Sequence, residues 1–123
     1  MKGNRIILAE DDATLANVIE EALKDVSVGA VVASDGKAAL TALRENPAIP
    51  ILVTDVRMPK MDGYELVTQA LSEFPDLKVV MMTGYAEEKP PLEVLKAREF
   101  RFLRKPISMG SLQTLIVDLL SRP

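Results

Sequence analysis

The sequence predicts an α/β fold in which a doubly wound (βα)5 chain forms a five-stranded parallel sheet. Short apolar runs rich in β-branched residues alternate regularly with segments whose apolar residues recur at helical spacing. Parallel strands need such helical crossovers, which place helices on both faces of the sheet. The length of 123 residues suits one core. We therefore expect residues 1–123 to form a single domain, with no output domain in this chain.

The first strand is predicted at residues 5–9 (RIILA), and a helix follows it. The apolar stripe of that helix comprises Leu15, Val18, Ile19, Ala22, Leu23 and Val26. Residues 28–33 (VGAVVA) form the second predicted strand. Asp35 and Gly36 then begin a helix that we expect to end near Asn46 and Pro47.

The third strand is predicted at residues 49–54 (IPILVT). Asp62 has the character of a helix N-cap, and Glu65 three positions later completes a capping box. Met61, just before the cap, is placed to pack against Leu66 as a hydrophobic staple. This helix should end before Pro75, and residues 77–82 (LKVVMM) form the fourth strand.

The fourth helix is expected to be short because prolines at positions 90 and 91 fit only its first turn. We place it at residues 91–97, followed by a strand at residues 100–103 (FRFL). Ser108 should cap the last helix. Its apolar face comprises Leu112, Leu115, Ile116, Leu119 and Leu120.

The composition excludes several classes of function. The chain has no cysteine and no histidine, which excludes disulfides, thiol nucleophiles, histidine-based acid/base catalysis and Cys- or His-ligated metals. A net charge of -3 gives no reason to expect direct nucleic-acid binding. The apolar runs are too short to cross a bilayer and no signal peptide is evident, so we expect a cytoplasmic protein without membrane contact.

Polar residues gather where the predicted strands end. They are Glu10 and Asp11 after the first strand, Asp55 after the third, Thr83 after the fourth and Lys105 after the fifth. Ligands of open α/β sheets bind at this edge. Carboxylates converging there repel one another unless a cation is present, and ligands that are all oxygens favour a hard ion such as Mg²⁺. Asp55 could then act as a nucleophile toward a phosphoryl group, assisted by Mg²⁺ and the Lys105 ammonium.

Each of these residues also has an ordinary structural explanation. Asp55 could be a turn aspartate satisfied by backbone amides, and Thr83 could cap a loop. Glu10 and Asp11 could compensate a helix macrodipole, and Lys105 could be a solvated lysine. Asp12 fits the role of N-cap of the first helix better than that of a metal ligand.

Four fragments in order carry a resemblance to a known family: LAEDD, TDVRMPKMDG, MMTGYA and FLRKP. Together they resemble the receiver domain of bacterial two-component response regulators across nearly the whole chain. The resemblance implies a flavodoxin-like strand order 2-1-3-4-5 and a phosphorylation-dependent signalling switch. It makes Asp55 the phosphoacceptor, and it implies that Glu10, Asp11, Asp55 and the backbone carbonyl of Arg57 hold Mg²⁺.

By the same resemblance, Thr83 is the switch hydroxyl and Lys105 is the ion partner of the phosphoryl group. The phosphodonor would be a histidine kinase or a histidine phosphotransfer protein. The signal would pass to an unknown downstream protein through the face formed by the fourth helix, the fifth strand and the last helix, and phosphorylation could drive a homodimer. Phe102 stands where the family often has a switch tyrosine, and Arg57 and Tyr85 occupy positions that tune dephosphorylation in the family.

Two other functions compete with this one. A haloacid-dehalogenase-type phosphatase also uses a strand-end aspartate with Mg²⁺, but its second aspartate, two residues on, is replaced here by Arg57. We therefore expect no enzyme beyond self-phosphorylation and self-dephosphorylation. A phosphate-independent interaction module of the same fold is the other alternative. It should have lost an acidic, threonine or lysine position, and none is lost.

Overall fold

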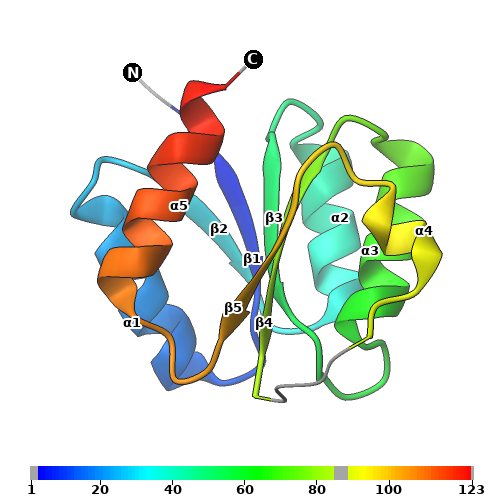
Figure 1. Ribbon diagram of the computed structural model, residues 1–123, viewed down its shortest axis with the longest axis horizontal. Coiled ribbons are helices and arrows are strands. Elements are labelled where there is room, and N and C mark those ends of the chain that lie inside the picture. Colours follow the sequence, from blue (N-terminus) through cyan, green and yellow to red (C-terminus); the bar gives the residue numbers. More distant parts are fainter. Residues whose placement is uncertain (1–2, 85–88, 123) are drawn as a thin grey trace.

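The computed structural model describes residues 3–84 and 89–122. Its core is one parallel sheet of five strands in the order β2-β1-β3-β4-β5, which confirms the predicted topology (Figure 1). The strands are β1 (Ile6–Ala9), β2 (Ala30–Ala33), β3 (Ile51–Asp55), β4 (Lys78–Thr83) and β5 (Phe100–Arg104).

Helices cover both faces of the sheet, as a doubly wound fold requires. Figure 1 shows α1 (Ala13–Lys24) and α5 (Met109–Ser121) on one face. On the other face are α2 (Gly36–Glu45), α3 (Gly63–Glu73) and α4 (Leu92–Leu95). None of the helices among residues 3–84 and 89–122 is long and apolar enough to span a bilayer.

The three central strands are buried on both faces, which explains their continuous apolar sequences. Alternate residues enter two separate cores, because successive side chains of a strand point to opposite faces. Leu8, Val53 and Val80 pack toward α1 and α5. Ile7 and Leu52 pack toward α2 and α3. The helices at the two faces are thus held by the same strands.

The predicted helix starts are confirmed by side-chain caps. The carboxylate of Asp12 accepts hydrogen bonds from the N–H groups of Thr14 and Leu15 at the start of α1. Asp62 and Glu65 form the capping box of α3. The Asp35 carboxylate and the Ser108 hydroxyl accept the corresponding bonds in α2 and α5. These local bonds satisfy orphan N–H groups, which is why the sequence could predict them.

Three expectations from the pattern need correction. The fourth helix is a single turn, Leu92–Leu95, and is shorter than the predicted 91–97. Val18, counted in the apolar stripe of the first helix, is 46% exposed. Asp55 and Thr83 are the last residues of β3 and β4, whereas we expected each of them to follow its strand.

The C-terminus of α1 holds Ser27 in the left-handed region, with φ 63°. The N–H groups of Val28 and Ser27 donate to the carbonyls of Leu23 and Lys24, in the pattern of a Schellman motif. Because glycine occupies this conformation without a Cβ clash, Ser27→Gly should raise the free energy of unfolding by about 1 kcal/mol. Urea denaturation measures the change, and an unaltered or lower midpoint would contradict it.

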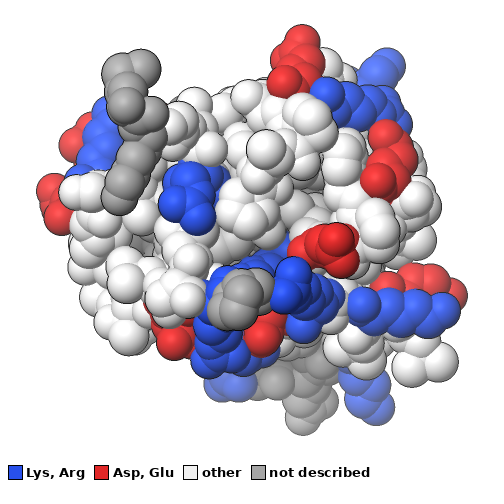
Figure 2. All heavy atoms as spheres, turned by 90° about the horizontal axis from the view of Figure 1, so that it is seen from above, with Lys and Arg blue, Asp and Glu red and all other residues white. Residues whose placement is uncertain are grey.

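The end of the molecule opposite Asp55 carries interleaved charges, as Figure 2 shows. Glu99 pairs with Arg101 at 2.8 Å and with Arg122 at 3.2 Å, and Arg122 pairs with Asp118 at 2.7 Å. Beneath them lies Lys78, whose side chain is directed to the C-terminus of α5. This network ties the start of β5 to the end of α5.

Candidate functional site

The residues predicted to form the site come together at the carboxyl edge of the sheet. Ala9 at the end of β1 is in register with Thr54, so Glu10 and Asp11 follow beside Asp55. Thr83 ends β4, one residue beyond Met82, the register partner of Asp55. The parallel order of β1, β3 and β4 thus places segments that are distant in sequence side by side.

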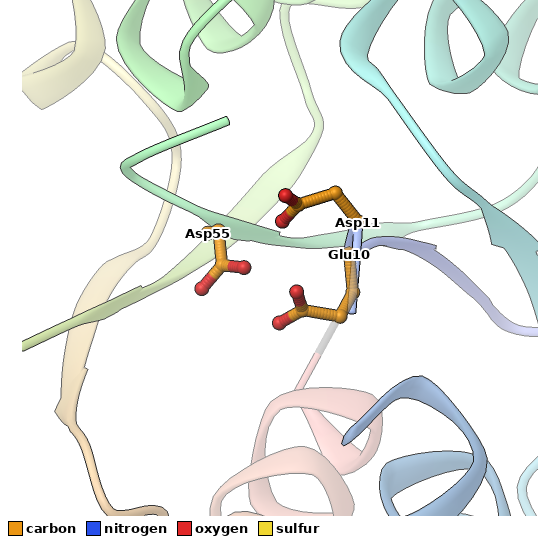
Figure 3. A group of neighbouring side chains, drawn as sticks. All are labelled: Glu10, Asp11 and Asp55. Carbon is orange, nitrogen blue, oxygen red and sulfur yellow. The ribbon is translucent and has the colours of Figure 1, made fainter. Parts of the chain in front are cut away.

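Glu10, Asp11 and Asp55 form an acidic cluster (Figure 3). Each offers a carboxylate oxygen, and these oxygens lie within 4.8 Å of one another. Glu10 and Asp55 are each 2% exposed, whereas Asp11 is exposed to solvent. The carboxylates of Glu10 and Asp11 point toward Asp55 from the end of β1. The cluster is therefore accessible to solvent at Asp11, whereas Glu10 and Asp55 are buried.

Local bonds fix Glu10 in this arrangement. Its N–H donates to the carbonyl of Ala33 at 3.0 Å, which extends the pairing of β1 with β2 by one residue. Its Oε2 accepts a bond from the N–H of Asp12 at 2.9 Å. Asp12 uses its own carboxylate to cap α1. The three successive acidic residues thus differ in role, as the sequence predicted for Asp12.

Lys105 supplies the positive charge at this edge. Its Nζ lies 2.5 Å from Oδ1 of Asp55 and 3.8 Å from Oε1 of Glu10. Its backbone N–H donates to the carbonyl of Thr83 at 2.7 Å, and the bond to Pro106 is cis. The lysine therefore reaches from the end of β5 across β4 to the acidic cluster.

Burial dominates the protonation of the cluster. Burial, together with the neighbouring Asp55 carboxylate, raises the pKa of Glu10 to about 8. Burial lowers the pKa of Lys105, but Asp55, Glu10 and Asp11 outweigh that effect and raise it above its ordinary value. Without a bound metal ion, Glu10 is therefore largely protonated near neutral pH.

The raised pKa of Glu10 predicts that stability depends on pH. A carboxyl whose pKa is raised in the folded state contributes fully below its unfolded value of 4.5, and the contribution is lost as pH rises through about 8. The free energy of unfolding of the metal-free protein should fall over this range, by up to about 1.4 kcal/mol per pH unit. Urea denaturation at several pH values measures the slope.

A Glu10→Gln variant is the control for this prediction, because it keeps the shape of the side chain and cannot titrate. The free energy of unfolding of this variant should change less with pH than that of the unmodified protein. Since Mg²⁺ binding would require ionised Glu10, added Mg²⁺ should stabilise the protein more at about pH 8.5 than at about pH 6. Equal slopes in the two proteins would contradict the assignment to Glu10.

The donor set suits a hard cation. Oε1 of Glu10 and Oδ1 of Asp55 are buried, and neither accepts a regular hydrogen bond from any described residue, although both face the Lys105 ammonium. Carboxylate oxygens are the ligands Mg²⁺ prefers, and a magnesium ion completes its shell with waters. The cluster could therefore hold Mg²⁺ through one oxygen from each carboxylate.

Gly63 is a supporting residue that the sequence analysis treated only as part of a helix start. A Cβ at this position would overlap the carbonyl oxygen of Asp55 and lie 2.7 Å from Cε of Met81. Its N–H also donates to the carbonyl of Val56 at 2.7 Å. The first residue of α3 thus packs on the backbone of Asp55 itself. The Asp-Gly pair was the available signal, but the contact depends on the tertiary fold.

The remaining predicted positions lie around the cluster. Arg57 is exposed and follows Asp55 by two residues, so its carbonyl belongs to the segment that borders the site. Thr83 is 5% exposed. Phe102 is 36% exposed and packs edge-to-face on Phe100, with ring centroids 5.0 Å apart. Tyr85 lies outside the described residues.

Comparison with known proteins decides the family. Residues 6–117 match the family described as the response regulator receiver domain, which covers every element of the sheet. The chain is a receiver domain. Its acidic cluster is compatible with Mg²⁺ and an aspartyl phosphate, and two-component signalling is the setting of this family.

Relatives of this receiver domain differ in length. It is 34% identical over 108 residues to the response regulator receiver protein CpdR of Brucella abortus, covering 88% of this chain and 89% of CpdR. It is 30% identical to the sensor kinase CckA of the same organism, covering 95% of this chain and 12% of CckA. The crystal structure of a receiver domain protein from Clostridium thermocellum superposes with a TM-score of 0.87 at 25% identity, covering 98% and 96% of the chains.

Proposed function

We propose that this receiver domain, residues 1–123, is a phosphorylation-controlled switch with Asp55 as the phosphoacceptor. The observation that carries the proposal is the acidic cluster of Glu10, Asp11 and Asp55, with the Lys105 ammonium 2.5 Å from Asp55. Receiver domains are in general signalling switches and not enzymes with turnover. The absence of an acid two residues after Asp55, where Arg57 stands, supports the same conclusion.

The phosphodonor in this proposal is the phosphohistidine of a histidine kinase or of a phosphotransfer protein. An oxygen of the Asp55 carboxylate attacks phosphorus, the P–N bond breaks, and the imidazole nitrogen leaves with the bonding electron pair. Asp55 is held for this attack by the β3 ladder and by the packing of Gly63 on its carbonyl. The product is an aspartyl phosphate at the edge of the sheet.

The other residues of the site compensate charge. Glu10, Asp11, Asp55 and the Arg57 carbonyl would hold Mg²⁺, which when bound neutralises charge on the transferring phosphoryl group. The Lys105 ammonium moves from the carboxylate to a phosphoryl oxygen, because that oxygen carries the charge after transfer. The Thr83 hydroxyl donates to another phosphoryl oxygen. These shifts at the ends of β4 and β5 would start the signal.

The output in this proposal uses the face made of α4, β5 and α5. Leu92 is 76% exposed, Leu95 is 48% exposed, and Phe102 on β5 is 36% exposed. These side chains would supply apolar area for a partner to bury. In this proposal a downstream protein or a second phosphorylated copy binds there. We expect a cytoplasmic setting, where the phosphodonor domains of kinases lie.

The test is intact-mass spectrometry after incubation with acetyl phosphate, with and without Mg²⁺. We expect a Mg²⁺-dependent gain of one phosphoryl group in the unmodified protein and none in Asp55→Asn. Asp76→Asn, at an exposed carboxylate before β4 on the opposite end of the sheet, is the matched control and should still gain the group.

Two results would contradict the proposal. An adduct that persists in Asp55→Asn would place the acceptor elsewhere. No adduct, together with no Mg²⁺-dependent fluoroberyllate complex, would favour a phosphate-independent interaction module. A fluoroberyllate complex without an adduct would instead indicate an acyl phosphate that hydrolyses before detection, and would support Asp55 as acceptor.

A further inference from the structure

The segment from Val56 to Asp62 joins β3 to α3 and borders the acidic cluster. Its two ends are fixed by main-chain bonds. The N–H of Val56 donates to the carbonyl of Met82 at 3.0 Å, and the N–H of Gly63 donates to the carbonyl of Val56 at 2.7 Å. Between these ends the side chain of Met58 is buried in the core on the α2 and α3 face, with its Sδ 4.0 Å from Oγ1 of Thr54.

Met61 adds a second side-chain contact near the end of the segment, on a neighbouring helix. A Cβ on Gly36, the first residue of α2, would lie 2.8 Å from Sδ, 3.0 Å from Cγ and 3.1 Å from Cβ of Met61. Gly36 is buried, and none of the described glycines has a positive φ. Gly36 is therefore required for space and not for backbone conformation. The side chain of Met61 occupies the space that its missing Cβ leaves.

The turn just before Met61 holds a residue other than glycine at positive φ. The N–H of Met61 donates to the carbonyl of Pro59 at 2.8 Å, and Lys60 between them has φ 70°. A residue other than glycine keeps such a conformation only where its surroundings impose it. Met61 on Gly36 and the Asp62 cap of α3 are the two contacts that follow the turn.

We propose that Met61, seated on Gly36, is a positioning residue that holds the Val56–Lys60 segment beside the acidic cluster, so that the Arg57 carbonyl can complete the magnesium site. This inference rests on the proposed function, because it assumes that the cluster binds Mg²⁺. A segment that is already ordered before Mg²⁺ binds loses less conformational entropy on binding, so Mg²⁺ binds more tightly. The start of α2, which contributes no ligand, thereby contributes to metal affinity.

Gly36→Ala is the direct test, because its methyl group would displace Met61 while Asp35 can still cap α2 through the N–H of Ala38. Mg²⁺ binding is measured by titration calorimetry, and amide hydrogen exchange is measured on the metal-free protein. We expect Mg²⁺ binding about tenfold weaker, equal to about 1.4 kcal/mol. Exchange at Met61 and Gly63 should become about tenfold faster, with the amides of β1 unchanged.

Two further variants complete the test. Met61→Ala removes the thioether without altering α2, and it should weaken Mg²⁺ binding in the same direction. Gly110→Ala is the matched control, since a Cβ there meets only Oγ of Ser108 at 4.0 Å. Its Mg²⁺ affinity and its exchange at Met61 and Gly63 should equal those of the unmodified protein.

The results separate the positioning role from the proposed function. Normal Mg²⁺ binding in the unmodified protein, Gly36→Ala and Met61→Ala alike would overturn the positioning role and leave the proposed function intact. Faster exchange in β1 to the same extent as at Met61 and Gly63 would also overturn it, because that pattern indicates general destabilisation. No Mg²⁺ binding by the unmodified protein would overturn the magnesium site and this inference together.

Discussion

Gly63→Ala is expected to lower the free energy of unfolding by about 3 kcal/mol, at the upper end of the range for overpacked sites. The added methyl group would overlap the carbonyl oxygen of Asp55 and approach the Asp55 carbonyl carbon to 3.0 Å. A main-chain atom cannot rotate away as a side chain can. Either the end of β3 or the start of α3 must therefore shift, and the hydrogen bond from Gly63 to Val56 would be strained.

The same substitution should also slow phosphorylation, because the shifted backbone carries the proposed acceptor. Urea denaturation measures stability, and labelling with acetyl phosphate measures the phosphorylation rate of the folded fraction. Gly110→Ala on α5 is the control with no close neighbour, and it should lose no stability because alanine is the better helix former. Equal midpoints for the two variants would show that the contact at Gly63 is easily relaxed.

Lys78→Met should lower the free energy of unfolding by about 2 kcal/mol, the value of roughly two hydrogen bonds. Lys78 is 5% exposed, and its ammonium donates to the carbonyls of Leu119 at 2.5 Å and Arg122 at 3.0 Å. Leu119 is in the last turn of α5, where carbonyls lack partners within the helix. Methionine keeps the apolar length of the side chain but removes the donor and the charge that favours a helix C-terminus.

Lys37→Met on the exposed side of α2 is the matched control, and its effect should stay within about 0.5 kcal/mol. Amide exchange adds a local readout, because the last turn of α5 should become less protected in Lys78→Met while β1 changes less. Identical stability of the two variants would contradict a net stabilising contribution of Lys78. It would mean that losing the cost of burying the ammonium offsets the lost bonds.

Local chemistry explains what could be predicted from the sequence. The caps at Asp12, Asp35, Asp62 and Ser108 involve partners two or three residues away, so their signal is contained in short stretches. The buried strands also have a local signature, since a strand covered on both faces needs an unbroken apolar run. Proline at positions 90 and 91 correctly predicted a short fourth helix, although its end at Leu95 came earlier than expected.

The candidate site was predicted from one rule, that side chains at the carboxyl ends of parallel strands meet. The rule explains why Glu10 and Asp55 could be paired without knowledge of any distance. It does not say that these two carboxylates are buried, that Asp11 is exposed, or that Lys105 lies nearer to Asp55 than to Glu10. Those facts set the protonation of the cluster.

The sequence by itself determined the order of strands and helices, the helix starts and the identity of the acidic edge, because each depends on periodicity or on neighbours in the chain. Only the tertiary structure decided which glycines have close neighbours at the position of a Cβ and which carbonyls the buried lysine binds. Gly63 is constrained by the carbonyl of Asp55, Gly36 by Met61, and Lys78 by a helix end 41 positions later. Such contacts join residues that are far apart in the chain. They depend on close packing between elements, and no local sequence pattern records that packing.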